Sequence, residues 1–214
     1  MLTAVVIAKE CLPGRVKTRL HPPLSYEEAA EVASASLADT LDAIRSMPFT
    51  RRVLAFDGDV VPASAHGFEV LPQITGTLAQ RMAAVFDTID GPMVLIGMDT
   101  PQVSRASLEP LFTGWHAGID SWMGPATDGG WWALAMRDPN GAVVRGVPTS
   151  QEDTGRLQLE SLRAAGLTVD LLPEFTDIDT VADALEVAEL VPDGQFGRTF
   201  GALSRRLVAE HSFD

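Results

Sequence analysis

The sequence predicts an α/β protein built on a largely parallel central sheet. Short apolar segments alternate with amphipathic segments along the chain, which is typical of layered α/β folds. Residues 3–8 are apolar after Thr3, as expected of a strand buried on both faces. No repeat or long linker divides the 214 residues. We therefore expect one domain over residues 1–214, with a core at about 3–190 and a helical tail at 195–212.

The individual elements follow from hydrophobic periodicity and from turn residues. Strands are expected at residues 3–8, 52–56, 68–71, 93–97, 121–124, 131–136 and 167–172. Helices are expected at residues 25–47, 78–89, 104–115, 152–165, 180–190 and 195–210. Ser25 with Glu28, and Thr180 with Asp183, have the spacing of capping boxes at two helix starts.

Composition limits the classes of partner. The formal net charge is −13, and such a surface repels nucleic acid and anionic lipid. No apolar run approaches the ~20 residues of a membrane span, and the N-terminal segment resembles a first strand more than a signal peptide. We therefore expect a cytoplasmic protein that binds neither nucleic acid nor membrane. The single cysteine, Cys11, has no histidine placed beside it by a motif and is interpreted as a loop residue rather than a nucleophile.

The cations of the first loop predict a phosphate site. Lysine occurs only at Lys9 and Lys17, and both lie with Arg15 and Arg19 in an eleven-residue stretch after the first strand. Ligands of parallel sheets bind where strands end, and Gly14 would let backbone N–H groups approach an anion. If residues 15–19 are extended, the three cations at alternate positions point the same way. The loop is neither a Walker A nor a dinucleotide motif, and a solvated basic loop is the alternative.

Carboxylates follow two later segments. Asp99 comes directly after the apolar strand 93–97, and Pro101 then turns the chain away. Asp177 and Asp179 lie two residues apart, so on an extended segment both could face one metal ion. Carboxylate oxygens suit Mg²⁺ or Mn²⁺ bridging a diphosphate. The alternatives are that Asp99 and Asp179 only cap turns or helices.

Each of two further motifs has more than one possible interpretation. Asp128-Gly129-Gly130 offers bare backbone and a carboxylate for a sugar or acceptor hydroxyl, but it would also make a plain hairpin turn. Asp57-Gly58-Asp59 after the second strand resembles the nucleophile motif of haloacid-dehalogenase-type phosphatases. Those enzymes need a downstream lysine, and both lysines here lie upstream.

Five separated motifs occur in an order typical of one superfamily. They are Ala8-Lys9 with residues 13–20; Gln73, Gly76, Leu78, Arg81 and Met82; residues 97–101; residues 124–126 with 128–130; and residues 177–180 with Asp183. Together they resemble the GT-A-type nucleotide-diphospho-sugar transferases. The likeness extends over about residues 3–190 and is greatest to an uncharacterised bacterial family of predicted glycosyltransferases, related to the molybdenum-cofactor and 2-phospho-lactate guanylyltransferases.

The resemblance implies a three-layer α/β/α GT-A fold and a set of roles. The nucleotide would contact Ala8, Lys9, Gly14, Arg15, Lys17, Thr18, Arg19, Gln73, Gly76, Leu78 and Arg81. Asp99, Asp177 and Asp179 would hold the metal, and Asp128, Gly129 and Gly130 would face the acceptor. Lys17, Arg19, Asp99 and Asp128 would act in catalysis. Residues 77–80, where the family tends to have Asp-Leu-Gly, differ and leave the base preference open.

The expected function is therefore group transfer from a bound nucleotide. A transferase using Mg²⁺ or Mn²⁺ would pass a nucleotidyl or glycosyl group from a nucleoside triphosphate or nucleotide-sugar to a small acceptor. The residues do not choose between the two reactions. The alternatives are a nucleotide-binding module with weakened catalysis and the phosphatase described above. The sequence also leaves open whether the protein forms a homodimer.

Overall fold

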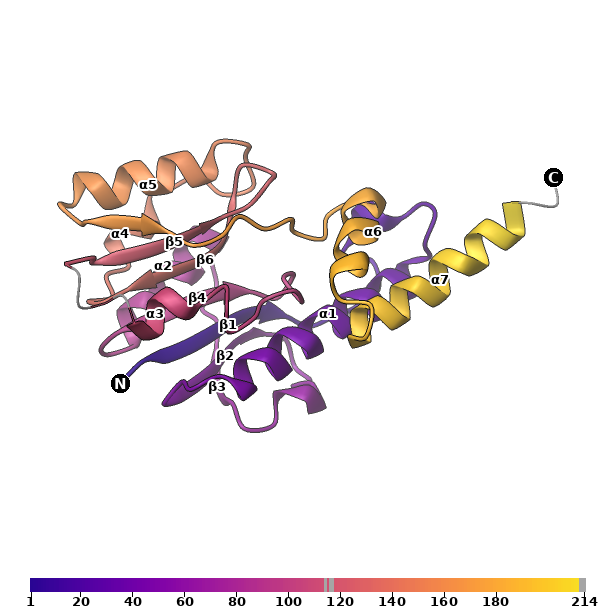
Figure 1. Ribbon diagram of the computed structural model, residues 1–214, viewed down its shortest axis with the longest axis horizontal. Coiled ribbons are helices and arrows are strands. Elements are labelled where there is room, and N and C mark those ends of the chain that lie inside the picture. The colour runs from indigo at the N-terminus through magenta and orange to yellow at the C-terminus, as the bar shows by residue number, and fades with distance from the viewer. Residues whose placement is uncertain (114, 116–117, 212–214) are drawn as a thin grey trace.

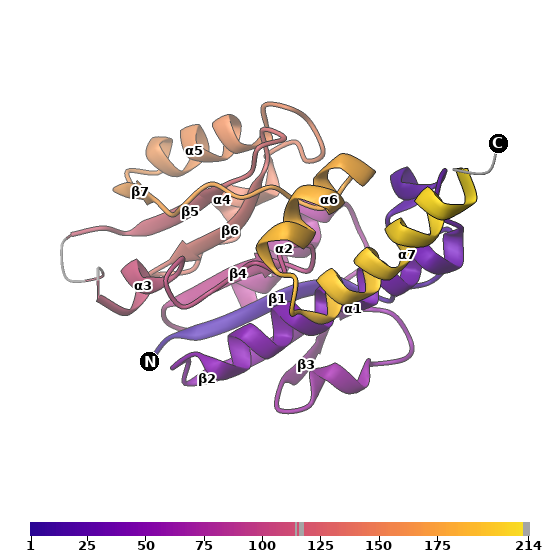
Figure 2. The ribbon, with the colours of Figure 1, turned by 45° about the vertical axis from the view of Figure 1, so that its right-hand side comes forward.

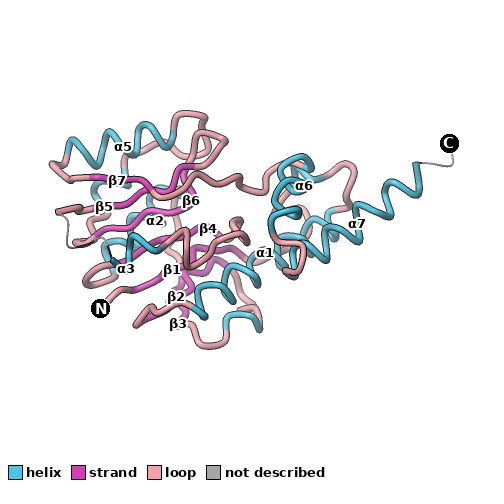
Figure 3. Tube along the Cα trace, in the orientation of Figure 1, coloured by secondary structure: helices cyan, strands magenta, loops and turns pink. Residues whose placement is uncertain are grey.

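The computed structural model describes residues 1–113, 115 and 118–211. Its centre is a seven-stranded sheet in the order β3-β2-β1-β4-β6-β5-β7 (Figure 3). The strands are β1 Thr3–Lys9, β2 Arg51–Asp57, β3 Glu69–Pro72, β4 Met93–Gly97, β5 Ser121–Pro125, β6 Trp131–Met136 and β7 Val169–Leu171. β6 runs antiparallel to β4 and β5, whereas the other neighbours are parallel. The predicted, mostly parallel α/β sheet is confirmed.

Helices cover both faces of this sheet (Figure 1). They are α1 Tyr26–Ser46, α2 Leu78–Thr88, α3 Glu109–Thr113, α4 Ala142–Arg145, α5 Thr154–Ala164, α6 Val181–Leu190 and α7 Gln195–His211. On one face, α1 and α3 pack against Val6 of β1 and Ile96 of β4. On the other face, α2, α4 and α5 pack against Val5 and Leu95. The alternation of neighbours between faces follows from the pleat and gives the expected three layers.

The chain changes direction across the sheet between β1 and β4. It builds β1, β2 and β3 outward to one edge and then returns to place β4 on the other side of β1. Lys9 at the end of β1 aligns with Asp57 at the end of β2, and Ile7 aligns with Gly97 at the end of β4. The loops after these strands therefore leave the same edge. In open α/β sheets this is where ligands bind.

The last two helices form a separate apolar cluster at one end of the molecule. Phe196 and Phe200 of α7 are buried against Leu20, Val32 and α6 residues such as Val187. Figures 1 and 2 show α6 and α7 beside α1, with the C-terminal part of α7 pointing away from the sheet. The Asp39 carboxylate of α1 accepts hydrogen bonds from the first backbone N–H groups of α7, which caps that helix.

Most predicted elements occur within a few residues of their expected positions, including both predicted capping boxes at Ser25 and Thr180. The expected helix over 104–115 is wrong at its start, because residues 105–108 are turns and only Glu109–Thr113 are helical. Pro110 lacks the N–H that would donate to the Ala106 carbonyl in a helix starting at residue 104. Residue 114 of that prediction, and residue 212 of the predicted tail, lie outside the described residues.

The short helix α4 was not predicted, because a single turn gives no periodicity to detect. Across the described ranges, no helix has both the length and the apolar sequence needed to cross a bilayer.

Candidate nucleotide and metal site

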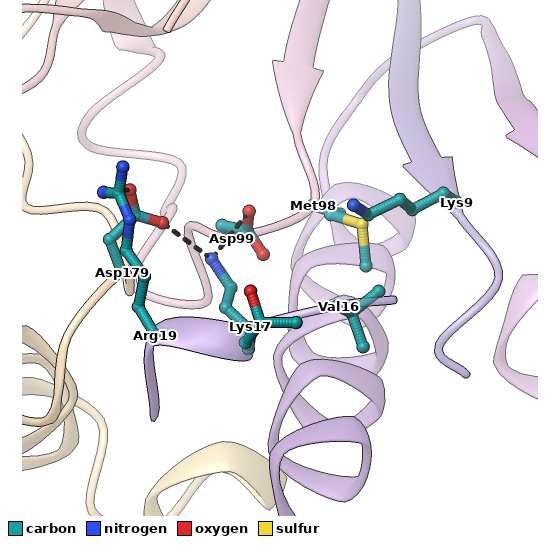
Figure 4. Close-up of a pocket in the computed structure, with 8 residues that line it drawn as sticks. Lys9, Val16, Lys17, Arg19, Met98, Asp99 and Asp179 are labelled. Atoms are coloured by element: carbon teal, nitrogen blue, oxygen red, sulfur yellow. Dashed lines mark hydrogen bonds and ion pairs between the residues drawn. The ribbon is translucent and has the colours of Figure 1, made fainter. Parts of the chain in front are cut away.

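Three loops bring oppositely charged side chains together at the ligand-binding edge of the sheet (Figure 4). The Lys17 Nζ atom, from the loop after β1, lies 2.8 Å from Asp99 Oδ2, which follows β4. It also lies 3.3 Å from Asp179 Oδ1, which precedes α6. Arg19 contacts the other oxygen of Asp179 at 3.2 Å. The structure thus places these four predicted site residues around one point, although they are up to 162 positions apart in sequence.

A small cavity opens at this point. It has a volume of about 200 Å³, and it is lined by Lys9, Val16, Lys17, Thr18, Arg19, Met98, Asp99 and Asp179. It is therefore a strongly charged cavity with a few apolar wall atoms. Six of its lining residues were predicted as site residues from the sequence, and Val16 and Met98 were not.

The loop after β1 turns Lys17 inward rather than extending. Lys17 has a left-handed backbone, with φ 47° and ψ 37°, and it precedes a 3₁₀ turn over Thr18–Leu20. The side chain of Lys17 is only 6% exposed, whereas that of Arg19 is 72% exposed. The expectation that Arg15, Lys17 and Arg19 point the same way is therefore wrong, because it required an extended segment. A non-glycine residue in this region is uncommon and is typical of functional sites.

The charge state of Lys17 is fixed by its surroundings. Burial alone would lower the pKa of the Lys17 ammonium, but the charges of Asp99 and Asp179 and their hydrogen bonds outweigh it and raise the pKa. Lys17 is thus a permanent buried cation at neutral pH.

Asp177 is the carboxylate most perturbed by its environment. Burial, followed by the negative charges of Asp99 and Asp128, raises its pKa to about 7. We name Asp99, Asp128, Asp177 and Asp179 the acidic cluster, because the charges of the other three all act on Asp177. Two oxygens of this cluster, Oδ1 of Asp99 and Oδ1 of Asp177, are buried without a hydrogen-bond partner. Buried polar atoms normally have one, so these two oxygens are suited to accept a bond from a cation or from a donor group of a ligand.

The acidic cluster fits a divalent metal whose other ligands come from a bound phosphate and from water. Within the described ranges, no three His, Cys, Asp or Glu residues are close enough to enclose an ion by themselves. Mg²⁺, however, is usually held by one or two carboxylates together with substrate phosphates and water. The unpartnered oxygens of Asp99 and Asp177 would supply two such ligands. Both oxygens of Asp179 already pair with Lys17 and Arg19. Asp179 could therefore bind a metal only if one of these ion pairs opened.

The Asp128-Gly129-Gly130 segment is a tight turn between β5 and β6. Asp128 Oδ1 accepts a 2.7 Å hydrogen bond from the Gly130 N–H. Gly129 has a φ of 85°, and its carbonyl accepts a 2.8 Å bond from Gly155 at the start of α5. The turn interpretation is therefore correct for the backbone. The exposed Asp128 carboxylate still lies close enough to act on Asp177, so a role toward an acceptor remains a prediction.

Gly129 gives a stability prediction. A Cβ atom there would lie 1.8 Å from the Glu152 carbonyl oxygen, so Gly129→Ala must displace backbone and should cost at least about 3 kcal/mol. Gly166 has a similar φ of 81° but has open space around the same position. The control Gly166→Ala should therefore cost only about 1 kcal/mol. Urea denaturation of both variants checks this, and equal losses would contradict the packing described.

The residues expected to line a nucleoside pocket, Gln73, Gly76, Leu78 and Arg81, are not among those that line the charged cavity. Gln73 Nε2 donates to the carbonyls of Ala8 at 2.8 Å and Ala55 at 2.9 Å, which joins β1 to β2. Arg81 forms an ion pair with Asp57 and donates to the Gly76 carbonyl at 3.0 Å. Gln73 and Arg81 thus support the loops after β1 and β2. Their contact with a base stays a prediction.

The altered segment 77–80 has a structural explanation. Thr77 and Gln80 form a reciprocal capping box that begins α2. The sequence interpretation missed this box, although Thr-x-x-Gln is one of its patterns. Gly76 has a φ of 146°, and a Cβ there would lie 2.5 Å from Gln80 Oε1. The Gly76–Gln80 turn is therefore a rigid helix start, and Leu78 is exposed on it.

Two positioning residues were missed by sequence reasoning. Gln102 Nε2 donates to the Thr176 carbonyl at 2.8 Å, which ties the loop of Asp99 to the loop of Asp177. Gln102 Oε1 is buried without a partner. Ser36 of α1 donates to the Met98 carbonyl at 3.1 Å and so fixes the residue before Asp99. Neither has a motif of its own, and only Gln102, directly after the Asp99-Thr100-Pro101 turn, could have been suspected from position.

Cys11 is unsuited to nucleophilic chemistry. Burial and the charge of Asp99 raise the pKa of its thiol to about 11, so the reactive thiolate is scarce at neutral pH. Asp57, the residue that matches the phosphatase nucleophile, is paired with Arg81 instead of facing the acidic cluster.

Comparisons with known proteins place the chain in a family. The sequence profile of a bacterial family described as "Uncharacterized protein conserved in bacteria (DUF2064)" matches residues 40–151, which is more than half of the chain. The chain belongs to the DUF2064 family. This DUF2064 protein is also similar to the 2-phospho-L-lactate guanylyltransferase of Haloarcula marismortui. The two are 29% identical over 179 residues, which are 80% of this chain and 79% of the other.

Solved structures share the fold. A Desulfovibrio desulfuricans G20 protein, classed as a nucleotide-diphospho-sugar transferase, has a TM-score of 0.77 and 24% identity, over 100% of this chain and 98% of its own. A Mycobacterium tuberculosis H37Rv protein solved with manganese has a TM-score of 0.53 and 19% identity, covering 87% of this chain and 96% of its own. These matches confirm the predicted GT-A-like fold of the DUF2064 protein.

Proposed function

We propose that this protein is a nucleotidyltransferase that binds a nucleoside triphosphate together with Mg²⁺ or Mn²⁺. The observation that carries the proposal is the buried Lys17 between Asp99 and Asp179, beside two carboxylate oxygens without partners. Cations and carboxylates that line one cavity match the needs of a metal-bound polyphosphate. The similarity to a guanylyltransferase favours nucleotidyl over glycosyl transfer.

The residues divide into a cationic and an acidic side. Lys17 and Arg19, with the exposed Lys9 of the same cavity, bind phosphate oxygens and neutralise the charge that develops on the leaving pyrophosphate. Arg15, exposed in the same loop, is a further proposed phosphate contact. Asp99 and Asp177 hold the metal, with Asp179 beside them. Bound there, the divalent ion supplies Lewis-acid polarisation of the phosphates. The manganese in the mycobacterial protein of the same fold is consistent with this choice of ion.

The reaction breaks the phosphoanhydride bond between the α- and β-phosphates and forms a new bond from the α-phosphorus to the acceptor oxygen. An acceptor oxygen attacks the α-phosphorus, the bond from the α-phosphorus to the bridging oxygen breaks, and pyrophosphate leaves. The acceptor, if it is a hydroxyl, gives up its proton, and the exposed Asp128 is the proposed base on the acceptor side. A phosphate acceptor would need no base.

Product analysis tests this function. The purified protein is incubated with each nucleoside triphosphate, Mg²⁺ or Mn²⁺, and 2-phospho-L-lactate, the substrate named for the relative, followed by other small phosphorylated acids. The expected result is pyrophosphate release that requires both metal and acceptor. Release of a nucleoside diphosphate from a nucleotide-sugar would instead favour glycosyl transfer. Tight nucleotide binding without turnover on any acceptor would favour the non-catalytic module.

A further inference from the structure

Lys17 already pairs with Asp99, the carboxylate whose other oxygen is the proposed metal ligand. Its ammonium lies 2.8 Å from Asp99 Oδ2 and 3.3 Å from Asp179 Oδ1, and the side chain is almost fully buried. The left-handed backbone at Lys17 directs the side chain into this position. Figure 4 shows the ammonium between the two carboxylates, with dashed lines to both.

A second cation beside Asp99 would repel this ammonium. Mg²⁺ or Mn²⁺ binds a carboxylate oxygen at roughly 2.1 Å, so an ion on the unpartnered Oδ1 of Asp99 would lie no more than about 7 Å from the Lys17 ammonium in its present position. At that separation a charge of +1 and a charge of +2 repel by several kcal/mol at a partly buried site. Lys17 and the metal therefore compete for Asp99 unless another anion draws Lys17 away.

We propose that Lys17 serves as an internal counter-ion that excludes free divalent metal from the nucleotide-free site. The second step of this inference rests on the proposed function. When a nucleotide binds, its phosphates pair with Lys17, and Asp99 is then free to bind the metal. Metal and polyphosphate then bind as one unit, and each strengthens the other. The ion pairs of Lys17 also hold the loops of Asp99 and Asp179 close together before the nucleotide binds.

The competition is tested with Mn²⁺ alone, without any nucleotide, from the electron paramagnetic resonance signal of unbound Mn²⁺ at pH 8. Lys17→Asn removes the charge while keeping a residue type that tolerates the left-handed backbone. We expect this variant to bind Mn²⁺ at least about tenfold more tightly than the wild type. Arg51→Gln removes a partly exposed cation at the start of β2, which pairs with Glu69 and lies away from the carboxyl ends of the strands; it is the control and should change Mn²⁺ affinity less than about threefold.

Equal or weaker Mn²⁺ binding by a folded Lys17→Asn protein would overturn the proposal. Should that variant unfold, labelling of the wild type decides the matter, because the chain has only two lysines. An amine-acylating reagent read out by mass spectrometry should modify Lys17 faster when Mn²⁺ is present, while the exposed Lys9 reacts at an unchanged rate. Unchanged labelling of Lys17 in protein saturated with Mn²⁺ would count against displacement.

Failure of this inference can be told apart from failure of the proposed function. The Mn²⁺ titration and the labelling involve no nucleotide. If the wild type binds no nucleoside triphosphate under any metal condition, the proposed function fails whatever the titration shows. If nucleotides bind but Lys17→Asn gains no Mn²⁺ affinity, only the counter-ion role is lost.

Discussion

Replacing Asp99 with asparagine is expected to lower kcat by at least about a hundredfold. Asp99 is the carboxylate that meets Lys17 and also carries an oxygen without a partner. An amide can still accept a hydrogen bond from Lys17, so the loop should keep its shape. It cannot, however, hold a divalent metal as a charged oxygen does. Steady-state pyrophosphate release over a range of Mg²⁺ concentrations measures the effect.

Asp57→Asn is the matched control for Asp99→Asn, because Asp57 also ends a parallel strand at the same edge of the sheet. Its carboxylate pairs with Arg81 rather than with Lys17. We expect kcat to change by less than about threefold, with a small rise in KM through Arg81. The phosphatase alternative predicts the reverse, with activity abolished in Asp57→Asn and retained in Asp99→Asn. That reversed pattern would end the transferase proposal.

Replacing Asp177 with asparagine is expected to stabilise the metal-free protein at pH 8. The pKa of Asp177 is raised from 3.8 to about 7, first by burial and then by Asp99 and Asp128. The folded state therefore binds more protons than the unfolded state between these two values, and the free energy of unfolding falls as pH rises through this window. Above pH 7 the ionised carboxylate costs about 2–4 kcal/mol. The neutral amide avoids this cost.

Thermal melts at pH 5 and pH 8, in the presence of a chelator, check this sign. The variant should melt about 5–10 °C above the wild type at pH 8, and much of that difference should vanish at pH 5, where Asp177 of the wild type is largely protonated. Added Mg²⁺ with a nucleotide should stabilise the wild type more than the variant, because Asp177 is a proposed ligand. A variant that melts at or below the wild type at pH 8 would show that Asp177 is not a strained carboxylate.

The fold could be predicted because its signals are local and repeated. β1 is apolar on both faces, and the capping residues Ser25 and Thr180 mark helix starts wherever they occur. The error at the start of α3 arose where a missing backbone donor overrides periodicity. Pro110 cannot donate to the Ala106 carbonyl, so the helix expected from residue 104 begins only at Glu109, and a count of apolar residues does not register that missing donor.

The sequence was enough to predict which loops form the candidate site, but not how their side chains are oriented. Strand ends at one edge of a parallel sheet must meet, so the proximity of the Lys17 loop to Asp99 followed from topology. The inward turn of Lys17 could not be derived, because it depends on a left-handed backbone angle at a lysine. Gln102 was equally hidden, since its bond to Thr176 joins segments 74 positions apart.

The central claim is that a metal-bound polyphosphate lies between Lys17 and the acidic cluster. Calorimetric titration of the wild type with the best-binding nucleoside triphosphate, in Mg²⁺ and then in a chelator, tests it most directly. The account predicts that Mg²⁺ tightens binding at least about tenfold, and that this gain disappears in Asp99→Asn. Binding that is equally tight without metal, or a metal gain that survives in Asp99→Asn, would contradict it.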